Sequence, residues 1–153
     1  MDSLGFDLLD RHVVDGRGAD IACADATGSL TYARLLERSA GLAGGLRVLG
    51  VRSGDEVAVE VPLGNLQVVI VCACIRLGAV PGGRGEVRIV DDDGTVRVRM
   101  DDHDLDLDLA VISKAGAADP APSLPEDPPD YRDAARATFG DTVDSLLAGA
   151  TIG

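Results

Sequence analysis

Hydrophobic and polar positions along the first half of the chain repeat with the periods of short helices and strands. Apolar side chains recur every three or four residues in some stretches and alternate in others. The pattern predicts, in chain order, a helix at 5–14, strands at 19–24 and 29–30, a helix from Thr31 to about Leu49, a strand at 56–61, a helix at 66–77 and a strand from 79. Thr31 is expected to cap its helix through the hydroxyl group, and Gly50 to end it.

The helix predicted at 66–77 lies between two predicted strands. Its residues are apolar almost all round, as in a helix that is buried against a sheet. Asn65 is expected to cap its first turn, and Gly78 to end it. A strand, a buried helix and a second strand predict a βαβ unit with parallel pairing and a right-handed crossover.

Three glycines, Gly41, Gly44 and Gly45, fall inside the helix that precedes this unit. Glycine weakens a helix interior by roughly 1 kcal/mol relative to alanine, so these positions need another reason. We expect them to let the helix pack closely against a sheet, with a kink as the alternative.

The second half of the chain changes character after Pro81. Two alternating segments flank Asp91-Asp92-Asp93-Gly94, whose last two residues suit a tight hairpin turn. The elements predicted here are a β-hairpin at 86–100, a half-solvated strand at 105–112, a Pro-rich linker at 114–130 and a helix at 131–148 that Gly140 interrupts. These elements predict an α/β fold: a small open sheet with a parallel βαβ core, plus the added hairpin and a C-terminal helix. The expected organisation is an α/β subdomain at 1–113, a linker at 114–130 and a C-terminal helical segment at 131–153.

Charge and cysteine content limit the kinds of binding partner, the cellular location and the cysteine chemistry that we expect. The 153 residues carry a formal net charge of −12, which argues against binding to nucleic acid or to anionic membranes. The first residues lack the pattern of a signal peptide, and no apolar run is long enough to span a bilayer, so a cytoplasmic location is expected. Cys23, Cys72 and Cys74 form a small, odd set that predicts buried thiols rather than disulfides or a metal site.

A series of spaced residues gives the first half a family resemblance. The matching residues are Leu30, Thr31, Tyr32, Leu35, Leu49, Gly50, Val51, Gly54, Asp55, Val57, Ala58, Pro62, Gly78, Ala79 and Val80. Their order and spacing make the segment from Ala19 to Pro81 resemble the N-terminal region of the adenylate-forming superfamily, which includes acyl-CoA synthetases, peptide-synthetase adenylation domains and luciferases. In that family these positions set turns, caps and packing, and none of them is catalytic.

The resemblance implies ATP-dependent activation of an acid, but this sequence lacks the residues that the reaction requires. In the family, a Ser/Thr/Gly-rich loop ending in Pro-Lys-Gly wraps the ATP phosphates, and a C-terminal lid supplies a catalytic lysine. Neither is present in this sequence, whose one lysine is Lys114. Because phosphoryl chemistry requires several preorganised donors, we expect a truncated, non-catalytic relative, a pseudoenzyme with no catalytic residue and no cofactor.

A residual crevice is the candidate ligand site. Open α/β sheets bind ligands beyond the carboxyl ends of their strands. The residues expected there are Gly64, Asn65, Gly82, Gly83 and Arg84.

Acidic residues also gather in one segment, which raises the question of a metal site. The set is Asp101, Asp102, His103, Asp104, Asp106 and Asp108. Alternate carboxylates on a strand lie about 7 Å apart, too far to share one ion, so a solvated face and no metal are expected. The loop from Asp91 fails as an EF-hand because Met100 stands where the bidentate Glu belongs. His103 has no nucleophile at a recognisable spacing, and His12 is expected to be a surface or boundary residue.

Three functions remain open at this stage. The first is a non-catalytic interaction or accessory domain that docks on a protein partner or forms a homodimer, since apolar surface of a partial domain must be covered. The second is a small-molecule-binding domain or unusual enzyme that uses the residual crevice. The third is one half of a split acyl-adenylating ligase, and a degenerate gene fragment is the remaining alternative.

Overall fold

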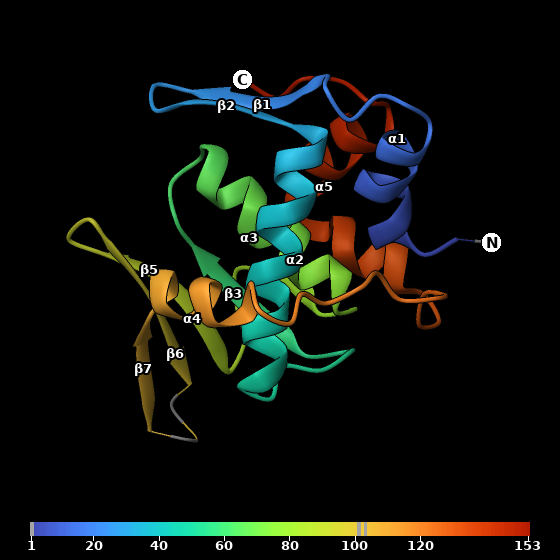
Figure 1. The fold of residues 1–153 in the computed structure, drawn as a ribbon. Helices are drawn as coiled ribbons and strands as arrows, with labels where there is room; N and C mark the ends of the chain where they lie inside the picture. Colours follow the sequence, from blue (N-terminus) through green and yellow to red (C-terminus); the bar gives the residue numbers. More distant parts are fainter. Residues whose placement is uncertain (1, 101, 103) are drawn as a thin grey trace.

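A computed structural model describes residues 2–100, 102 and 104–153 of the chain (Figure 1). Its elements are η1 (Phe6–Asp10), α1 (Arg11–Val14), β1 (Ile21–Asp25), β2 (Gly28–Thr31), α2 (Tyr32–Val48), β3 (Glu56–Glu60), α3 (Asn65–Arg76), β4 (Val80–Gly82), β5 (Val87–Asp92), β6 (Thr95–Met100), β7 (Leu105–Asp108), α4 (Leu109–Gly116) and α5 (Tyr131–Leu147). Within this described part, no helix has both the length and the apolar character needed to cross a membrane.

Five strands form one mixed sheet in the order β4-β3-β5-β6-β7, and β1 and β2 form a separate hairpin. β3 pairs in parallel with β4 on one side and with β5 on the other, which confirms the predicted βαβ unit. β5, β6 and β7 are antiparallel. The turn between β5 and β6 has positive φ at both Asp93 and Gly94, as the predicted Asp-Gly hairpin requires.

The main core lies on the face of the sheet that α3 and α4 cover, and α2 packs on these two helices. Alternate strand residues point into it, among them Val57, Val59, Val87, Ile89, Val98 and Met100. α3 is buried along almost its whole length, because its apolar residues contact both the sheet and α2. The opposite face of β6 and β7 carries charged side chains.

The chain crosses from β4 to β5 through only four residues, 83–86. The crossing passes directly against the backbone of β3, and a Cβ at Gly85 would collide with the carbonyl group of Glu56. Gly85 also has φ of +155°, so both space and backbone conformation call for glycine here. This crossing lets β3 have a parallel neighbour on each side.

The segment expected as a strand at 105–112 is a strand only as far as Asp108. Asp108 caps the helix α4 instead, because its side chain accepts a hydrogen bond from the amide of Ala110 at 2.8 Å. The glycines of α2 lie against this helix and not against the sheet, which corrects a second expectation. Gly41, Gly44 and Gly45 all have α4 or the residues just after it as their nearest neighbours.

The segment expected as a linker at 114–130 begins inside α4 and then packs along the helices. The amide of Ala121 donates to the carbonyl of Ala40 at 3.0 Å, and Ala121 is 2% exposed. The guanidinium of Arg76 donates to the carbonyl of Ala121 at 3.0 Å and pairs with Asp10 at 2.6 Å. A buried ion pair therefore ties α3, η1 and this segment together.

The C-terminal helix α5 bends at Phe139, whose φ and ψ of −110° and 33° are not helical. The bend lies one residue before Gly140, where the sequence predicted an interruption. The buried hydroxyl of Tyr131, at the start of α5, donates to the carbonyl of Ala79 beside β4. Burial raises the pKa of this phenol well above its usual range.

Tyr131→Phe is expected to lower the free energy of unfolding by about 1–2 kcal/mol, because the buried Ala79 carbonyl would lose a hydrogen bond. Equilibrium urea denaturation measures the change. Tyr32→Phe is the matched control: the Tyr32 hydroxyl donates at 2.7 Å to the carbonyl of Ala150, an exposed residue whose carbonyl can turn to water, so this change should cost less. An unchanged midpoint for Tyr131→Phe would contradict this anchoring role.

Candidate functional site

The residues predicted to line a crevice fall into two separate places. Gly64 and Asn65 stand at the start of α3, beside the turn of the β1–β2 hairpin. The Asp25 carboxylate in that turn accepts from the Asn65 amide at 2.7 Å, and a Cβ on Gly64 would lie 2.9 Å from it. Asn65 was expected to be the N-cap of α3, which is wrong: Gly64 holds that position, and Asp25 supplies the capping oxygen from a distant element.

The Asn65 side chain is itself held in place. Its amide nitrogen donates to Asp25 at 3.2 Å and to the carbonyl of Gly28 at 3.0 Å. Hydrogen bonds from Thr27 and then from Asn65 hold the pKa of the Asp25 carboxyl below its usual range. The Asn65 Oδ1 atom is buried without a hydrogen-bond partner in the described structure. It is an acceptor at a predicted ligand position, and its ligand role stays a prediction.

The other predicted residues follow β4. Gly82 faces Thr138 of α5, and Gly83 has no heavy atom within 4 Å of where its Cβ would be. Arg84 is 87% exposed and reaches back to Glu56, at the opposite end of β3 from α3, at 3.6 Å. The structure therefore does not bring Arg84 and Asn65 together, and a ligand role for each of them stays a prediction.

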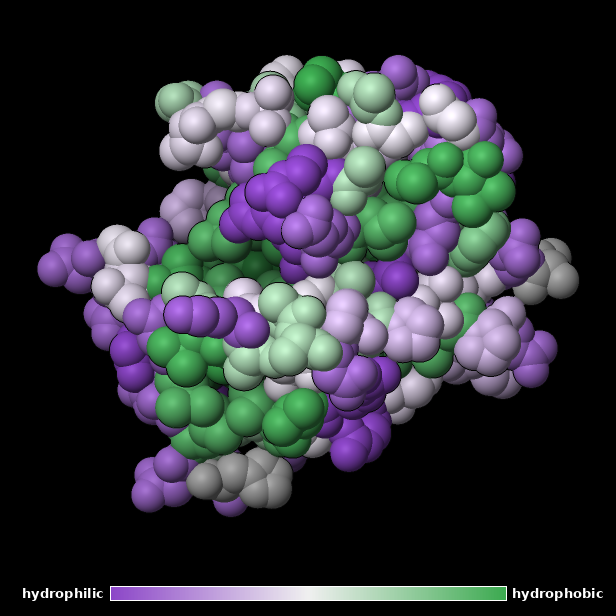
Figure 2. Space-filling model, viewed as in Figure 1, coloured by the Kyte–Doolittle hydropathy of each residue, from purple (hydrophilic) through white to green (hydrophobic). Residues whose placement is uncertain are grey.

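A groove between α2, α3 and α4 was not predicted from the sequence. It has a volume of about 290 Å³. Figure 2 shows a hydrophobic hollow beside α2 with hydrophilic side chains at its margins. The residues that line it are Arg34, Glu37, Arg38, Gly41, Leu42, Leu66, Val69, Ser113, Lys114 and Ala117.

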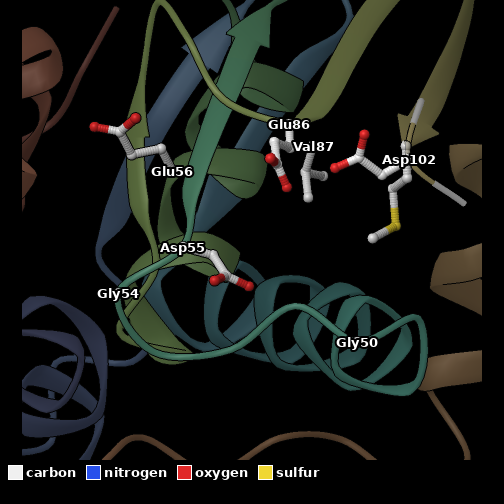
Figure 3. Close-up of a pocket in the computed structure, with 8 residues that line it drawn as sticks. Gly50, Gly54, Asp55, Glu56, Glu86, Val87 and Asp102 are labelled. Carbon is white, nitrogen blue, oxygen red and sulfur yellow. The ribbon is translucent and has the colours of Figure 1, made fainter.

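A second cavity, of about 560 Å³, is acidic (Figure 3). The side chains of Asp55, Glu86 and Asp102 point toward its space, whereas Glu56 points away. The residues that the structure describes include no group of three or more His, Cys, Asp or Glu placed to hold a metal ion. Carboxylates in this wall would repel a nucleotide phosphate.

Within the acidic segment, Asp106 forms ion pairs on the sheet. Asp106 on β7 pairs with Arg97 at 2.6 Å and with Arg99 at 3.4 Å. The hydrogen bond from Arg97 lowers the pKa of the Asp106 carboxyl. Asp101 and His103 lie outside the described residues, so the general-base hypothesis for His103 is not addressed. Met100 is buried in β6.

The three cysteines are unsuited to nucleophilic chemistry. All are buried and free, as predicted. Burial raises the pKa of the Cys23 thiol to about 11 and that of Cys74 to about 12, and it raises the pKa of Cys72 well above its usual range. The reactive thiolate is therefore disfavoured at all three positions.

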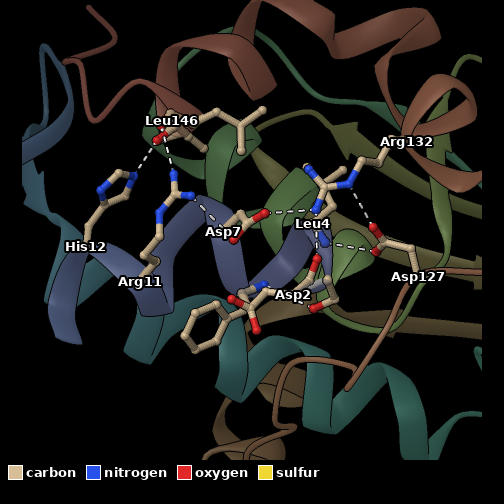
Figure 4. A network of polar contacts seen from close by, with 11 residues as sticks. Asp2, Leu4, Asp7, Arg11, His12, Asp127, Arg132 and Leu146 are labelled. Atoms are coloured by element: carbon tan, nitrogen blue, oxygen red, sulfur yellow. Dashed lines mark hydrogen bonds and ion pairs between the residues drawn. The ribbon is translucent and has the colours of Figure 1, made fainter. Parts of the chain in front are cut away.

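A polar network joins the first helical turns to the last helix (Figure 4). Arg132 of α5 pairs with Asp7 at 2.8 Å and with Asp127 at 2.9 Å. His12 was expected to be a surface or boundary residue, which is wrong: it is buried, at 4% exposed, and its Nε2 atom lies 2.7 Å from the carbonyl oxygen of Leu146. The His12 ring also packs against Tyr32, with 4.7 Å between centroids. These contacts are structural and show no catalytic arrangement.

Comparison with protein families shows which family the first half of this chain resembles. Residues 10–82 match the family described as AMP-binding enzyme. They form part of an adenylate-forming domain. We call residues 10–82 the adenylate-forming segment. It ends at Gly82, the last residue of β4, and contains the β1–β2 hairpin, α2, β3, α3 and β4.

Curated relatives support the same assignment. An uncharacterized protein of Pseudomonas aeruginosa is 41% identical over 78 residues, which are 47% of this chain and 12% of that protein. The acetyl-coenzyme A synthetase of Burkholderia thailandensis is 36% identical over 110 residues, which are 63% of this chain and 17% of the synthetase. The mitochondrial acyl-CoA synthetase short-chain family member 3 of Mus musculus is 32% identical over 81 residues, 49% of this chain and 12% of that protein. The chain thus spans about an eighth to a sixth of the relatives' length.

Among solved structures, the anthranilate CoA ligase AuaEII in complex with anthranoyl-AMP matches 54% of this chain and 16% of the ligase. The TM-score is 0.49 and the sequence identity is 20%.

Residues after Gly82 cover the adenylate-forming segment through buried contacts. α4 packs on α2, and α5 packs on β4. The last residues return to the hairpin, where Ile152 bridges to Cys23. Residues after Gly82 therefore cover much of the surface of the matched segment.

Proposed function

We propose that this chain is a non-catalytic accessory domain of adenylate-forming descent, which acts by binding and does not itself activate a carboxylic acid. The observation that carries the proposal is the closure of the adenylate-forming segment by residues 83–153. Glycine contacts between α2 and α4, the Tyr131 hydrogen bond to Ala79 and the Arg76 hydrogen bond to the carbonyl of Ala121 all contribute to it. The contacts of α4 with α2, of α5 with β4 and of Ile152 with Cys23 cover surface of the matched segment within the chain.

The lack of a phosphate cradle in these 153 residues supports the same proposal. Adenylation builds negative charge on the α-phosphate, which donors and cations must stabilise. The Gly-rich stretch at 82–85 has no hydroxyl group, and its cation, Arg84, pairs with Glu56. The nearby cavity is lined by carboxylates, which oppose phosphate binding.

ATP–pyrophosphate exchange tests the proposal. The purified chain is expected to give no exchange above the blank with acetate, propionate, octanoate or anthranilate. A full-length acetyl-coenzyme A synthetase assayed in parallel shows that the conditions support the reaction. Exchange that co-elutes with the chain and disappears after heat denaturation would overturn the proposal.

The partner in this role is proposed to be a second copy or another protein. Light scattering on the purified chain distinguishes the two, because a homodimer doubles the molar mass. A cytoplasmic location belongs to the same proposal, since three unbridged cysteines suit a reducing compartment.

A further inference from the structure

The basic residues of this acidic chain are almost all paired. Of the 14 Lys and Arg residues, all except Arg38, Arg52 and Lys114 form an ion pair with a carboxylate of the described residues. Arg52 donates to the backbone carbonyls of Arg47 and Val51 at 2.8 and 3.1 Å. The two cations that remain, Arg38 and Lys114, both line the groove between α2, α3 and α4.

The two cations come from opposite walls of the groove. Arg38 lies on α2, one helical turn after Arg34, so both project from the same face of that helix. Lys114 lies on α4. Glu37 also lines the groove, and its carboxylate is paired with Arg34 at 3.1 Å. The rim therefore carries an excess of positive charge in a chain whose formal net charge is −12.

The groove has an apolar floor beneath this rim. Leu42 is fully buried and Val69 is 3% exposed, and the half-buried Leu66 lies beside them. The hydrophobic hollow in Figure 2 lies where α2, α3 and α4 meet. An apolar floor with a few convergent polar groups is the usual composition of a small-molecule site.

We propose that this groove binds an amphipathic organic anion. The apolar body of the ligand lies on Leu66 and Val69, above the buried Leu42. Its head group, a carboxylate, sulfonate or phosphate, lies between Arg38 and Lys114. The volume of about 290 Å³ is near the lower end for ligand pockets, which favours a chain of the length of octanoate over a nucleotide or a coenzyme A ester.

This site goes beyond the proposed function and does not depend on it. A ligand in the groove is remote from the Gly-rich stretch after β4, and no step of carboxylate activation is assigned to it. A sulfonate probe cannot be adenylated, so its binding reports on the groove alone. Failure of the ligand test would leave the pyrophosphate-exchange result unaffected.

The experiment is a calorimetric titration of the full chain with octane-1-sulfonate and with octanoate, next to octanol and octylammonium as neutral and cationic matches. Saturable binding of both anions is expected, with the neutral and cationic compounds at least about tenfold weaker. Raising the ionic strength should weaken binding of the anions, because the cations at the rim are exposed. Amide chemical shifts in a parallel NMR titration should move at Gly41, Leu42 and Lys114.

Charge-neutral variants locate the head group. Arg38→Gln and Lys114→Gln together are expected to raise the Kd of octane-1-sulfonate by about tenfold. Arg52→Gln removes a cation outside the groove that has no ion pair among the described residues; it is the matched control and should leave the Kd unchanged. The positions are exposed, and circular dichroism checks that each variant is folded. Equal binding of octanol, an unchanged Kd in the double variant, or shifts confined to another surface would each overturn the proposal.

Discussion

Gly116→Ala is expected to lower the free energy of unfolding by about 3 kcal/mol, because the new methyl group would collide with backbone on both sides of a helix contact. A Cβ at Gly116 would lie far inside contact distance of the Gly41 carbonyl oxygen and the Gly45 amide nitrogen. Both obstacles are main-chain atoms of α2, which cannot rotate away as a side chain can. The helices would have to separate, exposing Ile112 and the apolar residues beneath it.

Equilibrium denaturation in urea, followed by far-UV circular dichroism, measures this loss. Gly41→Ala is the matched control on the other helix. Its Cβ would meet the nearest atom, the Cα of Ala117, at 3.6 Å, which is ordinary contact. That variant should keep its stability or gain up to about 1 kcal/mol from helix propensity. If Gly116→Ala and Gly41→Ala unfold at the same midpoint, the close contact between α2 and α4 is wrong.

Arg76→Met is expected to cost about 3–5 kcal/mol, because it leaves the Asp10 carboxylate without its partner in a poorly hydrated site. The Arg76 side chain is 5% exposed and that of Asp10 is 20% exposed. The guanidinium also satisfies the Ala121 carbonyl, so its removal affects three segments at once. Thermal and urea denaturation of the purified variant give the change.

Two further variants separate a buried ion pair from a surface one. Replacing both partners, as Arg76→Met with Asp10→Leu, should recover part of the loss, since no unpaired charge then remains. Arg34→Gln removes an exposed pair with Glu37 and should change stability by less than about 1 kcal/mol. A loss for Arg76→Met no larger than that for Arg34→Gln would contradict the buried role.

The local elements of the first half could be predicted from sequence because their signals are local. Thr31 accepts from the amide of Arg34 at 3.1 Å, as its position before an apolar repeat indicated. The Asp-Gly turn after β5 also carries its conformation in its own two residues. Parallel pairing of β3 with β4 followed from the length and burial of the helix between them.

The errors over Asn65 and His12 arose where a distant residue decides the outcome, and the error over 109–112 arose from a local helix cap. Asn65 has the chemistry of a cap, but Asp25 reaches the same helix end from 40 residues away. Residues 109–112 continue an apolar alternation that suits a strand, and the Asp108 cap turns them into a helix. His12 is buried because α5 closes over it, and no pattern near His12 foretold that contact.

For the candidate site, too, local features could be predicted from the sequence and long-range contacts could not. Sequence spacing placed Gly64 and Asn65 after β3, yet it could not show that Arg84 turns toward Glu56. The groove could not be predicted at all, because its walls come from α2, α3 and α4. Lys114 was recognised as the one lysine, but only the fold places it across from Arg38.

The β1–β2 hairpin has a consequence for local opening of the protein. A two-stranded ribbon is marginally stable by itself, and these strands lie outside the main sheet. When the ribbon detaches, Asp25 withdraws its oxygen from the amide of Asn65, so the first turn of α3 loses its acceptor. We therefore expect fraying at the sequence-distant start of α3 to accompany detachment of the hairpin.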